Sequence, residues 1–478
     1  MGTLASQFGG ETGGERIQRA IDSAANEAGS NVVVVDENGP DDGVWVLESA
    51  IELPSHTTLH LEGATLRLAD GATDNLLRNA DYEDGNEEIH VVGIGEARLD
   101  GNGKNQKRID DGSHETVGIH LYNVETVTLS GFSIGPTENW AIAPENVVDL
   151  TVSNIHFAQD GSKLNQDGLH VTGPAERITV TNLTGTCDDD AVIARSGEGL
   201  YGEGGDLCGM TVSNVTIRNV HSCGIFRTTA QAGSVIDGVY ATNLQMISEE
   251  EAGDAALKVG WNGHEDAYRD VTPEEHRNIV IENVGVNRWD GPFCTIQQPV
   301  KGLTIRGVRA RHTGPLLWNE EHDVVGLTLE DCESTLTGNP PETLMSDFYT
   351  NVLNGERWLP EDQYHADVLD DPPGAVTFDH GALRDVTLRD IRFRFDPDGN
   401  FDGDGPHPTA VRIAETAAIG GLTIDNCSVY DYSTGVRIDE AADVRRTQCS
   451  GVRQSNVNHP WKTEGAAITA SENDPEHT

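Results

Sequence analysis

A short pattern recurs along this chain: apolar, any, apolar, any, then glycine, asparagine or aspartate, then apolar. It is complete in 127–132 and again in 150–155. Further copies occupy 178–183, 210–215, 279–284, 303–308, 327–332, 386–391 and 422–427. Such a unit cannot bury its own apolar face and does so only by stacking on its neighbours. The recurrence therefore predicts a solenoid.

The small or amide residue of each unit measures the repeat. The positions Gly131, Asn154, Asn182 and Asn214 are separated by 23, 28 and 32 residues, and Asn283, Gly307 and Asp331 by steps of 24. The segment 58–68 alternates apolar and polar residues, as half-buried strands do. Leucine-rich repeats lack this strand density, and propeller blades are longer. We predict an all-β fold, a single-stranded right-handed parallel β-helix.

The first thirty residues break this rhythm. Ile17, Ala20, Ile21 and Ala24 recur at helical spacing after Thr12 and two glycines. We expect an N-terminal capping α-helix at about 13–28, covering a strand edge that would otherwise invite aggregation. We predict one β-helix domain over 1–462. A proline-rich loop excursion is expected at about 338–374, and a flexible acidic C-terminal tail at 463–478.

Charge limits the possible partners. Lys and Arg total 32 and Asp and Glu total 79, so the formal net charge is -47. Such a chain repels phosphate backbones and anionic lipid, so we expect neither nucleic acid nor a membrane as partner. Concentrated salt would screen the repulsion among the carboxylates, which favours a halophilic source. The sequence carries no signal for the oligomeric state.

The start of the sequence lacks the basic and apolar regions of a signal peptide, and no run of about 20 apolar residues appears. As written, the chain is expected to be cytoplasmic. Trimming of the sequence or non-classical export would make an extracellular or virion location possible. Seven scattered cysteines do not form a disulfide framework.

Polar residues interrupt the apolar rhythm in consecutive units. These interruptions are 165–170, 187–192, 221–224 and 257–259. Asp167 and Asp190 are 23 residues apart, which places them in adjacent coils about 4.8 Å apart. Glycoside hydrolysis needs two carboxyl groups, one that donates a proton and one that is ionised. A lone aspartate in so acidic a chain is ordinarily solvated surface or a turn residue. The combination at one-coil spacing indicates a site.

These motifs resemble the polygalacturonase-type glycoside hydrolases of family 28. That family carries Asn-x-Asp-Gly, Gly-Asp-Asp, His-Gly and Arg-Ile-Lys on successive coils of a pectin-lyase-like β-helix. Asn165, Asp167 and Gly168 match the first element, and Asp189-Asp190 matches the second, with Asp188 at the glycine position. The resemblance implies that Asp189 is the general acid, that Asp167 and Asp190 activate water, and that the reaction inverts the anomeric carbon. Asp188-Asp189 is the other possible pairing.

The remaining elements depart from the family. Cys223 replaces the motif histidine and Ala256 the motif arginine, while Lys258 is present. Lysine offers a point charge where arginine would bind a carboxylate with two hydrogen bonds. The expected substrate-binding residues are Asn165, Lys258, Arg227, His170, His221 and Trp261, with Arg195 as an alternative cation and Trp140 and Trp289 as further stacking residues.

No cofactor is implied. The acids at 188–190 with Asp167 resemble an oxygen-rich calcium environment, so calcium is a possible ligand, but no EF-hand spacing exists. The expected partner is a carbohydrate substrate. Two other functions fit the residues: a uronate lyase or epimerase using Lys258 or Arg227 as base, and a non-catalytic glycan-binding or virus-spike-like β-helix.

Overall fold

A computed structural model describes residues 2–25, 31–107, 116–163, 165–202, 204–219, 224–247, 255–261, 266–289, 291–312, 314–319, 322–337, 374–396, 408–414, 417–439, 443–444 and 446–463. Two compact units are present. The first unit is Met1–Ile225 with Gly233–Tyr240, and the second is Phe226–Ala232 with Ala241–Thr478. Each unit is described by itself.

The first unit consists almost wholly of strands. Its elements are β1 (Thr3–Leu4), a short 3-10 turn (Ala5–Gln7), α1 (Gly13–Ala25), β2 (Val32–Asp36), β3 (Val44–Leu47), β4 (Ile51–Leu53), β5 (Thr58–Glu62), β6 (Thr65–Leu68), β7 (Leu77–Asn79), β8 (Asn86–Ile94), β9 (Arg98–Asp100), a second 3-10 turn (Gly103–Asn105), β10 (Ile119–Ser130), β11 (Ser133–Ile134), β12 (Ile142–Ala158), β13 (Leu169–Cys187), β14 (Val192–Arg195), β15 (Leu207–Asn219) and the first part of β17 (Ile236–Ile247).

The second unit continues the same kind of structure. Its elements are β16 (Phe226–Thr229), the rest of β17, β18 (Leu257–Val259), α2 (Asp266–Arg269), β19 (His276–Trp289), β20 (Cys294–Ile296), β21 (Val300–His312), β22 (Leu317–Asn319), β23 (Val324–Leu336), β24 (Val376–Phe378), β25 (Ala382–Arg384), β26 (Val386–Phe395), β27 (Thr409–Ile413), β28 (Ala418–Ile419), β29 (Leu422–Asp425), β30 (Ser428–Tyr430), β31 (Thr434–Ile438), β32 (Asp443–Val444), β33 (Thr447–Ser450), β34 (Arg453–Ser455) and β35 (His459–Thr463).

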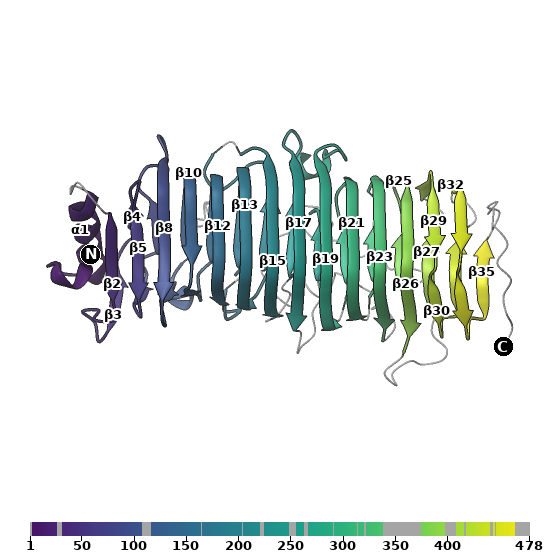
Figure 1. Cartoon of the computed structure of the whole chain (residues 1–478), viewed down its shortest axis with the longest axis horizontal. Coiled ribbons are helices and arrows are strands. Elements are labelled where there is room, and N and C mark those ends of the chain that lie inside the picture. The colour runs from purple at the N-terminus through teal and green to yellow at the C-terminus, as the bar shows by residue number, and fades with distance from the viewer. Residues whose placement is uncertain are drawn as a thin grey trace. The chain divides into compact units, whose positions relative to one another are not determined.

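Parallel pairing in each unit follows the sequence repeat. In the first unit β10, β12, β13 and β15 lie side by side (Figure 1), and their register pairs Val127 with Leu150, Ile155 with Leu183, and Leu183 with Val215. In the second unit Ile279 pairs with Leu303 and Leu303 with Leu327. These are the offsets of the repeating pattern, so the prediction of a parallel β-helix is confirmed. The paired apolar residues are buried and form the core.

The bend in each unit is made by a residue in the left-handed backbone region. Asn154, Asn182 and Asn214 have φ between +54° and +56°, which asparagine tolerates better than most residues. Their side chains also hydrogen-bond from coil to coil. Asn182 Nδ2 donates to Asn154 Oδ1 at 3.1 Å, and Asn214 Nδ2 donates to Asn182 Oδ1 at 3.2 Å. We call these three residues the asparagine ladder.

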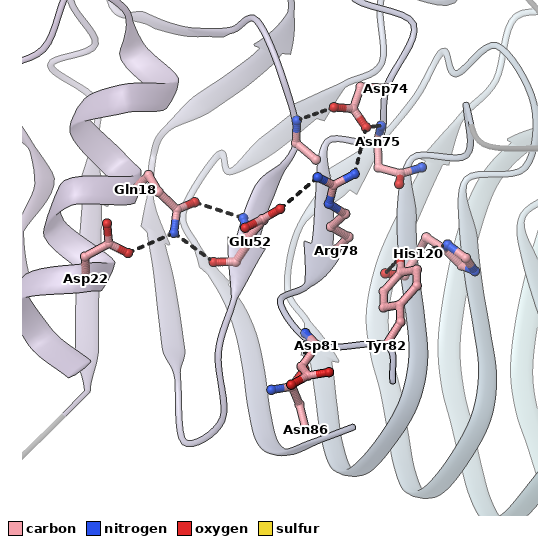
Figure 2. Close-up of polar contacts among 11 residues, drawn as sticks. Gln18, Asp22, Glu52, Asp74, Asn75, Arg78, Asp81, Tyr82, Asn86 and His120 are labelled. Atoms are coloured by element: carbon pink, nitrogen blue, oxygen red, sulfur yellow. Dashed lines mark hydrogen bonds and ion pairs between the residues drawn. The ribbon is translucent and has the colours of Figure 1, made fainter. Parts of the chain in front are cut away.

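The predicted N-terminal helix is present as α1, and residues 26–30 lie outside the described residues. It buries Ile17, Ala20, Ile21 and Ala24, and the Thr12 hydroxyl accepts the N–H of Glu15 at 3.2 Å. The amide of Gln18 accepts the N–H of Glu52 at 2.9 Å and donates to its carbonyl at 3.1 Å, as Figure 2 shows. A side chain therefore satisfies backbone groups of β4, as a neighbouring strand would.

Several expectations fall on other parts of the chain. The loop at 338–373 and the tail from 464 onward lie outside the described residues, so the proposed domain limits stay predictions. Within the described residues, no helix is long and apolar enough to span a membrane. The cysteines in the described residues are free thiols.

Candidate active site

Asp167 and Asp190 occupy equivalent positions in neighbouring coils of the first unit. β13 pairs with β14 so that Leu169 lies beside Val192. Immediately before these strands, the N–H of Gly168 donates to the carbonyl of Asp190 at 3.0 Å. The two aspartates therefore start from backbone positions about one strand spacing, 4.8 Å, apart. The 23-residue spacing in the sequence agrees with this register.

The three aspartates differ in accessibility. Asp190 is fully buried, Asp167 retains 3% of its exposure, and Asp189 is only half-buried. The backbone of Asp188 also pairs with the neighbouring coil, because its N–H donates to the carbonyl of Gln166 at 3.2 Å. Asp189 is thus the member of the Asp189-Asp190 pair that solvent or a ligand reaches most easily.

His170 lies beside Asp167 on β13. Its Nδ1 is 3.4 Å from Oδ2 of Asp167, and both side chains are almost completely buried. The indole of Trp140 stacks on the imidazole with ring centroids 3.7 Å apart and planes inclined by 28°. Trp140 thereby holds the ring that contacts the carboxylate. Trp289, another predicted stacking residue, has no exposed surface and packs inside the second unit.

The turn that carries Asp167 is fixed by side-chain amides that the sequence analysis did not single out. Gln159 Nε2 donates to the carbonyl of Asp167 at 3.1 Å, and its Oε1 accepts the N–H of Thr137 at 2.9 Å. Gln166 Nε2 donates to the carbonyl of Thr137 at 2.6 Å. Asn165, predicted to bind substrate, is half-buried with φ +57°. Glutamine next to a motif gives no sequence signal by itself.

Glu145 is a second feature that sequence patterns missed. It lies on β12 with 2% exposure, and its carboxylate accepts the N–H of Leu200 at 2.8 Å and of Tyr201 at 3.1 Å. Burial raises its pKa, while those two N–H groups and the charge of Arg195 oppose the rise. Leu200 packs against Val117, Trp140 and Ala143. Glu145 therefore anchors the segment that follows β14 onto the Trp140 side of the site. We call this contact the Glu145 clamp.

Two of the cationic candidates, Arg227 and Lys258, lie in the second unit, and the alternative cation Arg195 lies on β14 of the first. Arg227 on β16 is paired in register with Lys258 on β18. Lys258 has 1% exposure and Arg227 is half-buried. Trp261 contacts Tyr268 edge-on, with centroids 4.6 Å apart. His221 and Cys223 lie outside the described residues. The substrate-binding role of His221 therefore stays a prediction, as does the effect of having Cys223 at the position of the motif histidine.

Within the described parts of the chain, no group of three or more His, Cys, Asp or Glu side chains is arranged to hold a metal ion. The absence of a cofactor stays a prediction, because it concerns the whole protein.

The structure defines a parallel β-helix in which Asp167 and Asp190 precede two neighbouring strands. The family model of glycosyl hydrolases family 28 matches residues 40–284, which is just over half of the chain. The chain belongs to this family. The match contains Asp167, Asp189, Asp190 and Lys258.

This chain is similar to one curated relative in sequence and to two solved structures in fold. The probable endopolygalacturonase A of Aspergillus niger is 26% identical over 228 residues, covering 42% of this chain and 60% of the relative. This chain therefore matches about 60% of that protein's length. The N-terminal fragment of bacteriophage Phi29 gene product 12 has a TM-score of 0.55 at 13% identity, covering 97% of this chain and 72% of that one. The tailspike of E. coli bacteriophage HK620 has a TM-score of 0.52 at 11% identity, covering 92% and 76%. Both structures show the fold alone.

Proposed function

We propose that this protein hydrolyses glycosidic bonds in a poly- or oligosaccharide of the polygalacturonase type, with inversion at the anomeric carbon. The observation that carries the proposal is the equivalent placement of Asp167 and Asp190 on neighbouring coils, with the more accessible Asp189 beside them. Membership of family 28 supports the same reaction class.

In the proposed reaction Asp189 donates its proton to the glycosidic oxygen as the bond from that oxygen to the anomeric carbon breaks. A water molecule attacks the same carbon from the opposite face, and its proton passes to the Asp167 and Asp190 carboxylates. Solvent then returns a proton to Asp189 and removes one from the pair. Every proton is accounted for, and no cofactor enters the cycle.

His170 is assigned a positioning role. Its contact with Asp167, and the stacking of Trp140 on its ring, hold one carboxylate oxygen in a defined direction. The roles of Asn165, Arg227, Lys258, His221 and Trp261 in substrate binding stay predictions from the sequence.

The test is a reducing-end assay on polygalacturonate and on mixed uronate-containing polysaccharides, at low and at molar salt. Asp189→Asn is expected to lower kcat by about a thousandfold, the size of effect expected for a lost general acid. Asp188→Asn is the matched control and is expected to retain most activity. Proton NMR of the first product should show the inverted anomer.

Three outcomes would reject the proposal. The first is Asp189→Asn with a wild-type rate. The second is binding without any new reducing ends, which would favour a glycan-binding protein. The third is product with an unsaturated end, detected by ultraviolet absorbance, which would identify a lyase. A loss of activity in Asp188→Asn alone would move the acid pair to Asp188-Asp189.

A further inference from the structure

Three tyrosines from distant parts of the sequence meet on the first unit. Tyr82 follows β7, Tyr122 lies on β10, and Tyr201 lies in the segment after β14. Tyr201 contacts Tyr82 edge-on at 4.9 Å and Tyr122 edge-on at 4.8 Å, measured between ring centroids. Tyr82 and Tyr122 are 5.8 Å apart. We call Tyr82, Tyr122 and Tyr201 the tyrosine cluster.

Two buried polar side chains, His120 and Glu145, hold the cluster in place. The Tyr82 hydroxyl lies 2.8 Å from Nδ1 of His120, a contact drawn in Figure 2. Nε2 of His120 lies 3.9 Å from Oε1 of Glu145, whose carboxylate accepts the N–H of Tyr201. The Tyr201 backbone is therefore fixed by a residue with 2% exposure, while the Tyr201 side of the cluster is open, with 50% exposure. A fixed and exposed aromatic ring is suited to stacking on a ligand.

The cluster continues directly into the candidate active site. Leu200, the neighbour of Tyr201 in the Glu145 clamp, packs against Trp140. Trp140 stacks on His170, and His170 contacts Asp167. A chain of side-chain contacts therefore joins Tyr201 to the side of the site that holds Asp167.

The charges around the cluster do not favour an acidic sugar. Arg78 neighbours His120 in the register of β7 and β10, and its guanidinium lies 2.8 Å from Glu52 and 3.5 Å from Asp74. Burial lowers the pKa of His120 to about 4, so that ring is neutral at pH 7. Arg195 lies two strands from Glu145 in the register, and its positive charge acts on the Glu145 carboxylate. Among the described residues with these contacts, Arg78 is paired with Glu52 and Asp74, and the charge of Arg195 acts on Glu145.

We propose that the tyrosine cluster is a binding subsite for an uncharged pyranose unit of the polysaccharide. This inference rests on the proposed function and adds that the substrate carries a neutral sugar near the bond that is cut. The apolar C–H face of the pyranose stacks on the Tyr201 ring, and the tyrosine hydroxyls exchange hydrogen bonds with the sugar hydroxyls. A uronate at this position would bring its carboxylate close to Asp74 and Glu145, whose charges act on Tyr82.

The test measures binding by calorimetry in the full chain carrying Asp189→Asn, so that the ligand is not cut. The probes are a galacturonate hexamer and a hexasaccharide in which galacturonate alternates with rhamnose. The alternating probe is expected to bind more tightly. Adding Tyr201→Ala should weaken its binding about tenfold, the effect of losing one stacking contact. Tyr201→Phe keeps the ring and should stay within about twofold of the parent.

The inference is overturned if Tyr201→Ala leaves both affinities unchanged, if it weakens the galacturonate hexamer equally, or if neither probe binds. Thermal unfolding of Tyr201→Ala and Tyr201→Phe at matched temperature checks that both variants are folded. Cleavage by the wild-type chain is measured separately. Tyr201-dependent binding without cleavage would reject the proposed function alone, and cleavage with Tyr201-independent binding would reject this inference alone.

Discussion

The imidazole of His170 lies 3.4 Å from the carboxylate of Asp167, three residues away on the same coil. In the family pattern a histidine stands on a later coil, at the position that Cys223 occupies here. The contact gives the carboxylate a histidine neighbour from its own coil. Trp140, stacked on the face of the ring, limits the rotation of that histidine.

A change at His170 should reduce the proposed activity without removing it. His170→Ala is expected to lower kcat by about tenfold to a hundredfold with a small change in KM, because one carboxylate loses its orientation while the aspartates remain. His170→Asn places an amide nitrogen near the position of Nδ1 and should recover part of the rate. Steady-state kinetics across pH checks this. Equal rates and pH profiles in all three proteins would contradict the positioning role.

Removing the Glu145 clamp should destabilise the segment after β14. Glu145→Ala leaves the N–H groups of Leu200 and Tyr201 without their acceptor in two part-buried bonds, and each such bond to a charged group is worth about 1.5–3 kcal/mol. Glu145→Gln keeps one acceptor oxygen and should lie between wild type and Glu145→Ala. Chemical unfolding and proteolysis near Tyr201 measure the two effects. Wild-type resistance to proteolysis in Glu145→Ala would show that the clamp is not needed.

Buried histidines should make stability depend on pH between about 4 and 6.5. Burial lowers the pKa of His120 and His312 to about 4 and that of His276 to about 3, from 6.5. The unfolded chain then binds more protons than the folded chain in this window. Stability is fully present above pH 6.5 and falls as the pH approaches 4, by roughly 3 kcal/mol per histidine at most.

The measurement is the urea midpoint at several pH values. Nδ1 of His312 donates to the carbonyl of Gly314, and its Nε2 accepts from the Ser334 hydroxyl. His312→Gln retains polar atoms but does not titrate, so its midpoint should vary less steeply with pH. The control is His56, exposed beside Glu88, whose hydrogen bond raises the pKa of His56. That shift acts above about pH 6.5, so His56→Gln should leave the slope at lower pH nearly unchanged. A flat wild-type profile from pH 7 to 4.5 would contradict the prediction.

The asparagine ladder allows a paired comparison at one position. Asn182→Ala loses the side-chain bonds to Asn154 and Asn214 and also forces alanine into φ +56°. Asn182→Gly loses the same bonds without the backbone cost. We expect the alanine variant to be less stable than the glycine variant by about 1 kcal/mol, the cost of the left-handed conformation. Equal unfolding free energies would mean that the bend relaxes.

Salt should stabilise the protein. With a net charge of -47, adding salt to about 1 M shortens the screening length to about 3 Å and weakens repulsion between surface carboxylates. Exposed ion pairs such as Lys301 with Glu274 weaken too, but such pairs contribute little. The thermal midpoint is expected to rise steadily with NaCl. A midpoint that falls or stays level up to molar salt would reject a halophilic character.

The repeat could be predicted in detail because a parallel β-helix is periodic. Each coil repeats the same alternation and the same bend, so the spacing of Asn154, Asn182 and Asn214 already contained the register of the strands. For the same reason the spacing of Asp167 and Asp190 indicated neighbouring coils. The departures at Cys223 and Ala256 were also visible without a structure.

The supporting contacts were decided only by the tertiary structure. Glu145, Tyr82, Tyr122 and Tyr201 carry no periodic signal, because the segments between strands differ in length and place side chains at unrelated intervals. A segment after β14 must fold back across β12 before Glu145 can accept its N–H groups. The sequence thus determined the coil, the register and the aspartates. Folding in three dimensions determined which buried groups hold the aspartates and which aromatic rings stand beside them, since those contacts join residues that no repeat relates.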